Sequence, residues 1–138
     1  MLKIDYREYA DEELGNIIGS EFSKFAEKNG VTGNYIPFCF VAKLDDEFAG
    51  VITGHAYYKE VKISDLLILE QFRGKYIGSK LIKAVEDYFG GKGYENINLS
   101  TYEFQAPDFY IKNGFQIEFI RKNINNPKLT KYFFIKYF

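Results

Sequence analysis

The chain has 138 residues, and its 18 basic and 19 acidic side chains give a formal net charge of −1. A chain of this length buries roughly 70% of its unfolded surface, so we predict one domain over residues 1–138. The balanced charge argues against a nucleic-acid binder, which usually shows a basic excess. The start is charged, and no apolar run approaches the length of a membrane span. We therefore expect a cytoplasmic protein without a signal peptide, and neither nucleic acid nor membrane as its partner.

Cysteine and histidine occur once each, as Cys39 and His55. A single cysteine excludes an internal disulfide and any cysteine-cluster metal site, so we expect no catalytic metal. Cys39 lies in an apolar run, where a cysteine usually acts as a small buried hydrophobic residue. Tyrosine and phenylalanine make up the 19% aromatic content, which we interpret as an aromatic β core.

Hydrophobic spacing and turn residues predict ten elements. In chain order they are a strand (2–6), a helix (11–28), three strands (38–44, 47–55 and 61–69), a helix (78–89), a strand (96–101), a short helix (106–112) and two strands (115–121 and 131–138). The second helix should bury one side, formed by Leu81, Ile82, Val85 and Phe89. This order predicts an α/β fold with a mixed, mostly antiparallel sheet of about seven strands flanked by helices.

A short basic turn, QFRGKYIGS over residues 71–79, joins a buried strand to the second helix. Successive amides at a helix start converge on an anion, and the helix dipole adds about half a positive charge there. Arg73 and Lys75 supply mobile positive charge. Gly74 and Gly78 would let phosphate oxygens approach the backbone, because neither has a Cβ. The spacing matches neither a P-loop nor GxGxxG.

A second segment, FQAPDFYIKNGF over residues 104–115, contains a tyrosine one helical turn before Asn-Gly-Phe. Pro107 suits a first helical turn, and Gly114 suits a left-handed helix stop. Two interpretations of Tyr110 stay open: a functional hydroxyl, or a core tyrosine whose hydroxyl is hydrogen-bonded.

Together these segments resemble two motifs of the GNAT superfamily of N-acetyltransferases, which use acetyl-CoA. Arg73, Tyr76 and Gly78 fall on the fixed positions of the pyrophosphate motif R/Q-x-x-G-x-G/A. Tyr76 departs from the motif, because it replaces the first glycine, although its N–H remains available. The second segment is similar to the family's F/L-Y-x-x-x-G-F/Y, and FQA followed by FY is typical of a bacterial subgroup. The resemblance covers about residues 38–138.

The resemblance implies acetyl-CoA as cosubstrate. In the family the strand before the turn splays from the next strand, here residues 96–101, and pantetheine enters the gap. A backbone amide around Ile68 or Leu69 would hold the oxyanion, and Tyr110 would protonate the departing thiolate. The implied cofactor-binding residues are Leu67, Ile68, Leu69, Arg73, Gly74, Lys75, Tyr76, Ile77, Gly78, Ser79, Ala106, Phe109 and Tyr110.

The general base stays open, because the family's acidic position aligns nearest Lys62. The candidates are Glu70, Asp65, Glu103 and His55. We favour Glu70 or Asp65 acting through water, although Glu70 could instead cap the turn.

The resemblance thus predicts direct acetyl transfer to a primary amine. Two alternatives remain: a catalytically degenerate CoA-binding module with a regulatory or interaction role, and a phosphate-binding domain unrelated to CoA. The acceptor, whether a small-molecule amine, a peptide N-terminus or a lysine side chain, stays open, as does the choice between monomer and homodimer.

Overall fold

The computed structural model describes all 138 residues, which divide into two compact units, Met1–Gly33 and Asn34–Phe138. The first unit contains helix α1 (Glu12–Lys28). Its start is capped by Asp11, whose side chain accepts a hydrogen bond from the Leu14 amide at 2.9 Å. Residues 2–6 form no strand, so that prediction is wrong. A strand needs a partner to pair its backbone groups, and this unit offers none.

The second unit is built on one six-stranded sheet with the order β1-β2-β3-β4-β6-β5. The strands are β1 (Ile36–Leu44), β2 (Glu47–Tyr57), β3 (Glu60–Ile68), β4 (Asn96–Tyr102), β5 (Gln116–Arg121) and β6 (Lys131–Tyr137). All neighbours pair antiparallel except β3 and β4, which are parallel. The predicted mixed, mostly antiparallel α/β architecture is therefore confirmed, with six strands instead of about seven.

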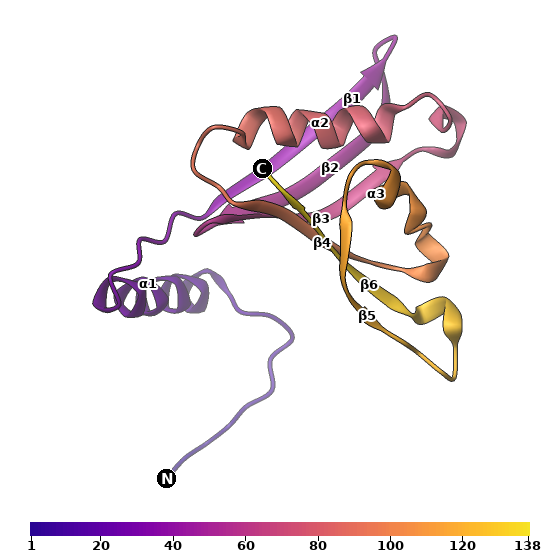
Figure 1. Cartoon of the computed structure of the whole chain (residues 1–138). Helices are drawn as coiled ribbons and strands as arrows, with labels where there is room; N and C mark the ends of the chain where they lie inside the picture. Colours follow the sequence, from indigo (N-terminus) through magenta and orange to yellow (C-terminus); the bar gives the residue numbers. More distant parts are fainter. The chain divides into compact units, whose positions relative to one another are not determined.

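Helix α2 (Ile77–Phe89) lies along one face of β1, β2 and β3 (Figure 1). It buries the predicted side, Leu81, Ile82, Val85 and Phe89. Helix α3 (Asp108–Lys112) begins later than predicted, because Ala106 adopts a left-handed conformation with φ 58°. Three short 3-10 helices, Glu70–Phe72, Glu103–Gln105 and Pro127–Leu129, complete the connections. None of the helices is both long and apolar enough to cross a bilayer.

Aromatic rings contribute to the core, as predicted: Phe89, Phe115 and Phe134 are buried in it. Cys39, however, is exposed, so its interpretation as a buried residue is wrong. Side chains along a strand alternate between faces. Phe38 and Phe40 pack against the core and leave Cys39, which lies between them, on the opposite face.

A β-bulge in β3 changes which side chains share a face. Thr53 of β2 pairs with Asp65, whereas the next residue, Gly54, pairs with Ile63, so Ser64 is the extra residue. Ile63 and Asp65 would share a face in a regular strand, but here they lie on opposite faces. Ile63 enters the core, and Asp65 is turned away from it.

Strands β3 and β4 separate after a short paired stretch. They pair only where Glu60–Lys62 lies beside Asn96–Asn98, although both strands continue. The predicted splay between these central strands is therefore present.

Candidate active site

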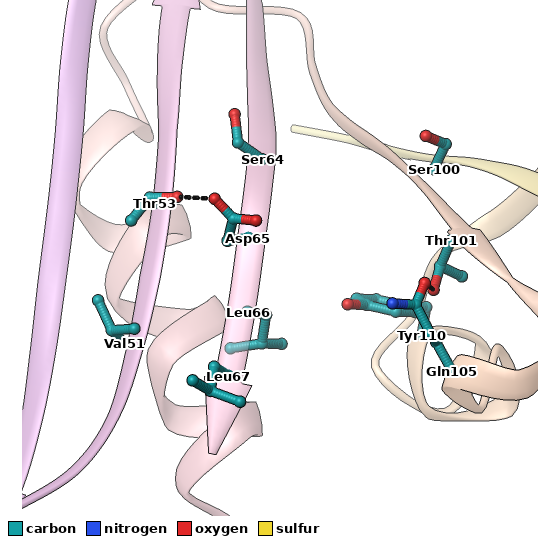
Figure 2. A pocket seen from close by; sticks show the side chains of 10 residues that line it. All are labelled: Val51, Thr53, Ser64, Asp65, Leu66, Leu67, Ser100, Thr101, Gln105 and Tyr110. Carbon is teal, nitrogen blue, oxygen red and sulfur yellow. Dashed lines mark hydrogen bonds between the residues drawn. The ribbon is translucent and has the colours of Figure 1, made fainter. Parts of the chain in front are cut away.

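The two diverging strands form the walls of a cavity of about 530 Å³, which lies entirely within the second unit. Residues of β2 and β3 form one wall, and residues of β4, the following turn and α3 form the other (Figure 2). Its lining residues are Val51, Thr53, Ser64, Asp65, Leu66, Leu67, Ser100, Thr101, Gln105 and Tyr110.

Tyr110 is a half-buried residue of α3 whose hydroxyl points into this gap (Figure 2). Its ring packs against Phe115 and Phe134, with centroids 5.8 and 5.6 Å away. No protein group forms a hydrogen bond with the hydroxyl. The alternative interpretation, a core tyrosine with a hydrogen-bonded hydroxyl, would require such a partner. Burial raises the pKa of Tyr110, so the hydroxyl stays protonated at neutral pH and is a weaker acid than the hydroxyl of an exposed tyrosine.

The start of α2 has unsatisfied amides. Tyr76 occupies the N-cap position without a capping side-chain hydrogen bond, and the first turn has no acidic residue. The amides of the first turn, from Ile77 to Ser79, have no partner within the helix. Lys75 and Arg73 lie immediately before them in the chain. In contrast to the capped and acidic start of α1, this helix start has the properties of an anion site.

Tyr76 adopts the left-handed conformation, with φ 63° and ψ 17°, and its side chain is 80% exposed. That conformation is normally occupied by glycine. The replacement of a motif glycine by Tyr76 therefore leaves the backbone of the turn in a glycine-like conformation. Gly74 is also left-handed, with φ +79° and open space around its missing Cβ.

Gly78 differs from the sequence interpretation. A Cβ on Gly78 would lie 2.9 Å from Cζ of Phe109 in α3 and 3.8 Å from Cγ1 of Ile68. The side-chain direction of Gly78 is therefore toward packed neighbours. The glycine allows α2 and α3 to approach, and this explains it without reference to phosphate oxygens.

Some backbone groups between β3 and the turn already have hydrogen-bond partners within the protein. Arg73 donates from Nε to the carbonyl oxygen of Ile68 at 3.1 Å, which ties its side chain to the end of β3. The Leu69 amide donates to the Ala49 carbonyl at 2.9 Å. Successive amides of a strand point to opposite edges, and the Ile68 amide therefore points toward the β4 side. Of the two predicted oxyanion donors, Ile68 is the available one.

Of the four candidates for the general base, only Asp65 lines the cavity. Asp65 lines the cavity together with Tyr110, and Thr53 donates a hydrogen bond to it at 3.0 Å. Glu70 is exposed in its 3-10 helix and does not line the cavity. Its carboxylate also accepts no hydrogen bond from the turn. The His55 ring lies tilted against the Tyr35 ring, with centroids 5.1 Å apart, and Glu103 starts the turn after β4.

Among the remaining predicted cofactor residues, only Leu67 lines the cavity. Ala106 instead provides the left-handed step before α3. Phe109 connects α3 to Gly78, and Ser79 is half-buried in the first turn of α2.

Sequence reasoning missed the polar lining residues Thr53, Ser64, Ser100, Thr101 and Gln105. A signal existed only for Gln105, which lies in the FQA segment. Its side-chain oxygen accepts hydrogen bonds from the Tyr102 amide and the Thr101 hydroxyl, both at 3.2 Å. Thr53 lies beside Asp65 because of the register between β2 and β3, which no local sequence motif predicts.

Comparison with known proteins places this geometry in a family. Residues 5–115 match the family model of the acetyltransferase (GNAT) family. The chain belongs to the GNAT family. The match includes α1, which carries no motif recognised from sequence, and it ends before β5 and β6. No curated protein matches the sequence significantly.

Solved structures share the GNAT fold. An acetyltransferase from Bacillus cereus ATCC 14579 is 24% identical, with a TM-score of 0.77 and coverage of 97% of this chain and 98% of the other. A protein from Agrobacterium tumefaciens, assigned as an acetyltransferase, is 19% identical with a TM-score of 0.81, covering 99% and 100%. The PaiA N-acetyltransferase from Thermoplasma acidophilum, in complex with coenzyme A, is 19% identical with a TM-score of 0.63, covering 95% and 81%.

Proposed function

We propose that this GNAT protein is an acetyl-CoA-dependent N-acetyltransferase that moves the acetyl group directly to a primary amine. The observation that carries the proposal is the proximity of three features, because Gly78 in the first turn of α2 lies against Ile68 at the end of β3 and Phe109 of α3. These are the splay of β3 and β4, the uncapped start of α2, and the Tyr110 hydroxyl directed into the gap. The coenzyme A complex of the Thermoplasma relative supports acetyl-CoA as the cosubstrate.

The chain has residues suited to each part of the cosubstrate. Amides of the first turn of α2, with Lys75 beside them, would hold the pyrophosphate. The free edge of β3 would pair with the pantetheine arm, whose amides resemble a peptide backbone. The Ile68 amide is suited to the thioester oxygen, where negative charge develops in the transition state.

The reaction balances with two proton transfers on the chain's own residues. The acceptor arrives as an ammonium ion and loses one proton, through water, to Asp65. The amine nitrogen attacks the thioester carbon, the carbon–sulfur bond breaks, and nitrogen loses its second proton to solvent as the amide forms. Asp65 then releases the first proton to solvent. Tyr110 donates a proton to the departing sulfur and is then reprotonated from solvent. The net products are an N-acetyl amine, CoA thiol and one released proton.

A thiol-release assay tests the proposal. The full chain would be incubated with acetyl-CoA and a panel of primary amines, and free thiol would be followed over time. Thiol release that requires an amine, together with the mass of an acetylated product, is the expected result. CoA binding without release for any amine in the panel would instead favour a CoA-binding module with a regulatory or interaction role.

A further inference from the structure

The cavity has one charged side chain, and that charge has no protein partner. Asp65 is the only Asp, Glu, Lys, Arg or His among the ten lining residues. The ion pairs of the structure join Lys24 to Glu21, Lys83 to Asp87 and Lys136 to Glu86, and none involves Asp65. A ligand in the cavity therefore meets a negative charge that forms no ion pair with a cation of the protein.

Asp65 is also held in position. The β3 bulge turns its side chain to the face shared with Thr53, and the Thr53 hydroxyl donates to Oδ2 of Asp65. This hydrogen bond uses only part of the accepting capacity of the carboxylate, because an ionised carboxylate has about four lone-pair sites. The rest of the carboxylate is free to accept hydrogen bonds from an ammonium group.

Gln105, on the opposite wall, provides a donor. A backbone amide is a donor only, so the Gln105 atom that accepts from Tyr102 must be the side-chain oxygen. Thr101 donates to the same oxygen, which leaves the amide nitrogen of Gln105 as the free group. Figure 2 shows this nitrogen on the side facing the gap. Two N–H groups are thus available to a ligand that carries a neutral oxygen.

We infer that the acceptor is a small primary ammonium ion that carries a neutral oxygen function, a hydroxyl or an amide carbonyl, and no acidic group. Asp65, oriented by Thr53, binds the ammonium, and the Gln105 amide nitrogen donates to the neutral oxygen. This inference rests on the proposed function, because it assigns the acceptor side of the same site. An amine that also carries a carboxylate is disfavoured, because its negative charge would lie near Asp65.

The experiment compares matched pairs of ligands that differ in one charge. Each pair is an amino amide and the corresponding amino acid, with several side-chain sizes. Binding is measured calorimetrically to the protein loaded with CoA, which lacks an acetyl group, so the measurement does not require turnover. We expect at least one amide to bind about tenfold or more tightly than its acid. Asp65→Asn should reduce that ratio to within about threefold of unity, and Thr53→Val should reduce it partially.

Gln105→Glu tests the second contact. It keeps a side-chain oxygen for Tyr102 and Thr101 but replaces the free donor by an acceptor, so the turn should stay folded. The variant should bind amino amides about tenfold more weakly, whereas a simple alkylamine without oxygen should not be weakened.

Three results would overturn the inference. They are equal binding of amide and acid, a binding ratio that Asp65→Asn leaves unchanged, and no binding by any pair. Failure of the proposed function is a separate result, since it is the absence of amine-dependent thiol release from acetyl-CoA. Selective binding without thiol release would thus retain the ligand class and reject the enzyme.

Discussion

Gly78 in α2 and Phe109 in α3 are in such close contact that a methyl group on Gly78 would lie 2.9 Å from the end of the phenyl ring. The two residues belong to the two sequence segments that resemble GNAT motifs. Their contact packs the start of α2 against α3, the helix that carries Tyr110. The cofactor end and the thiol end of the proposed site are therefore joined by packing.

Gly78→Ala tests this contact. The added methyl group should destabilise the fold by about 1–2 kcal/mol, because the Phe109 ring must shift in a packed environment. The measurement is chemical unfolding of the protein without cofactor. In a Phe109→Leu background the same substitution should cost clearly less, since the ring that blocks the methyl is gone. An equal cost in both backgrounds would contradict the packing role of Gly78.

Ser79→Glu separates cofactor binding from folding. Ser79 is the third helical position of α2, where a carboxylate interacts favourably with the helix dipole, by about 0.3–1 kcal/mol. Unfolding stability should therefore be equal or slightly higher than that of the native chain. The same charge would repel a pyrophosphate, and we expect CoA affinity to fall by about tenfold or more. Calorimetric titration measures the affinity, and Ser79→Gln serves as the neutral control.

Saturation with CoA should also stabilise the native chain. At a CoA concentration of about 100 times Kd, binding adds about 2.7 kcal/mol to the unfolding free energy. The shift is read in thermal unfolding, and Ser79→Glu should show it only at much higher CoA concentration. An equal shift in Ser79→Glu and Ser79→Gln would move the pyrophosphate away from the start of α2.

Tyr76→Gly addresses the departure from the family motif. A non-glycine residue in the left-handed conformation costs about 1–2 kcal/mol, and glycine removes that strain but increases the entropy of the unfolded chain. We therefore expect unfolding stability to change by no more than about 1 kcal/mol and CoA affinity to stay within about fivefold. A hundredfold loss of affinity would mean that the exposed ring packs on the cofactor.

The sequence predicted local features of this site well and long-range features poorly. The turn at residues 71–79 and the buried side of α2 follow from spacing within one segment, and both were found where expected. The packing of Gly78 against Phe109 was not predicted, because a sequence does not tell whether a missing Cβ faces a ligand or a distant ring. The pairing of Thr53 with Asp65 depends on a bulge in β3. A bulge shifts register by one residue and cannot be deduced from alternation alone.

Alkaline unfolding provides a test of the environment of Tyr110. Burial raises the pKa of Tyr110 in the folded chain above its ordinary value of 10.0. The folded state therefore resists ionisation, and the associated stability is full below that value and is lost as pH rises toward the folded pKa. Above about pH 10 the native chain should lose stability more steeply than Tyr110→Phe, as measured by unfolding across pH. Parallel curves for the two proteins would indicate a solvated hydroxyl.

The turnover rate of Tyr110→Phe tests whether the Tyr110 hydroxyl takes part in the reaction. The ring contacts with Phe115 and Phe134 survive this substitution, so folding and CoA binding should change little. If the hydroxyl protonates the leaving thiolate, kcat should fall by roughly 10² or more at neutral pH with little change in the KM for acetyl-CoA. The defect should shrink with an acyl donor whose thiol has a lower pKa, because such a thiolate leaves without protonation.

Tyr94→Phe is a matched control, since this half-buried tyrosine packs on Phe89 and does not line the cavity. Equal turnover of Tyr110→Phe and Tyr94→Phe with a good amine acceptor would show that Tyr110 is a packing residue. Catalysis would then rest on positioning and on the Ile68 amide.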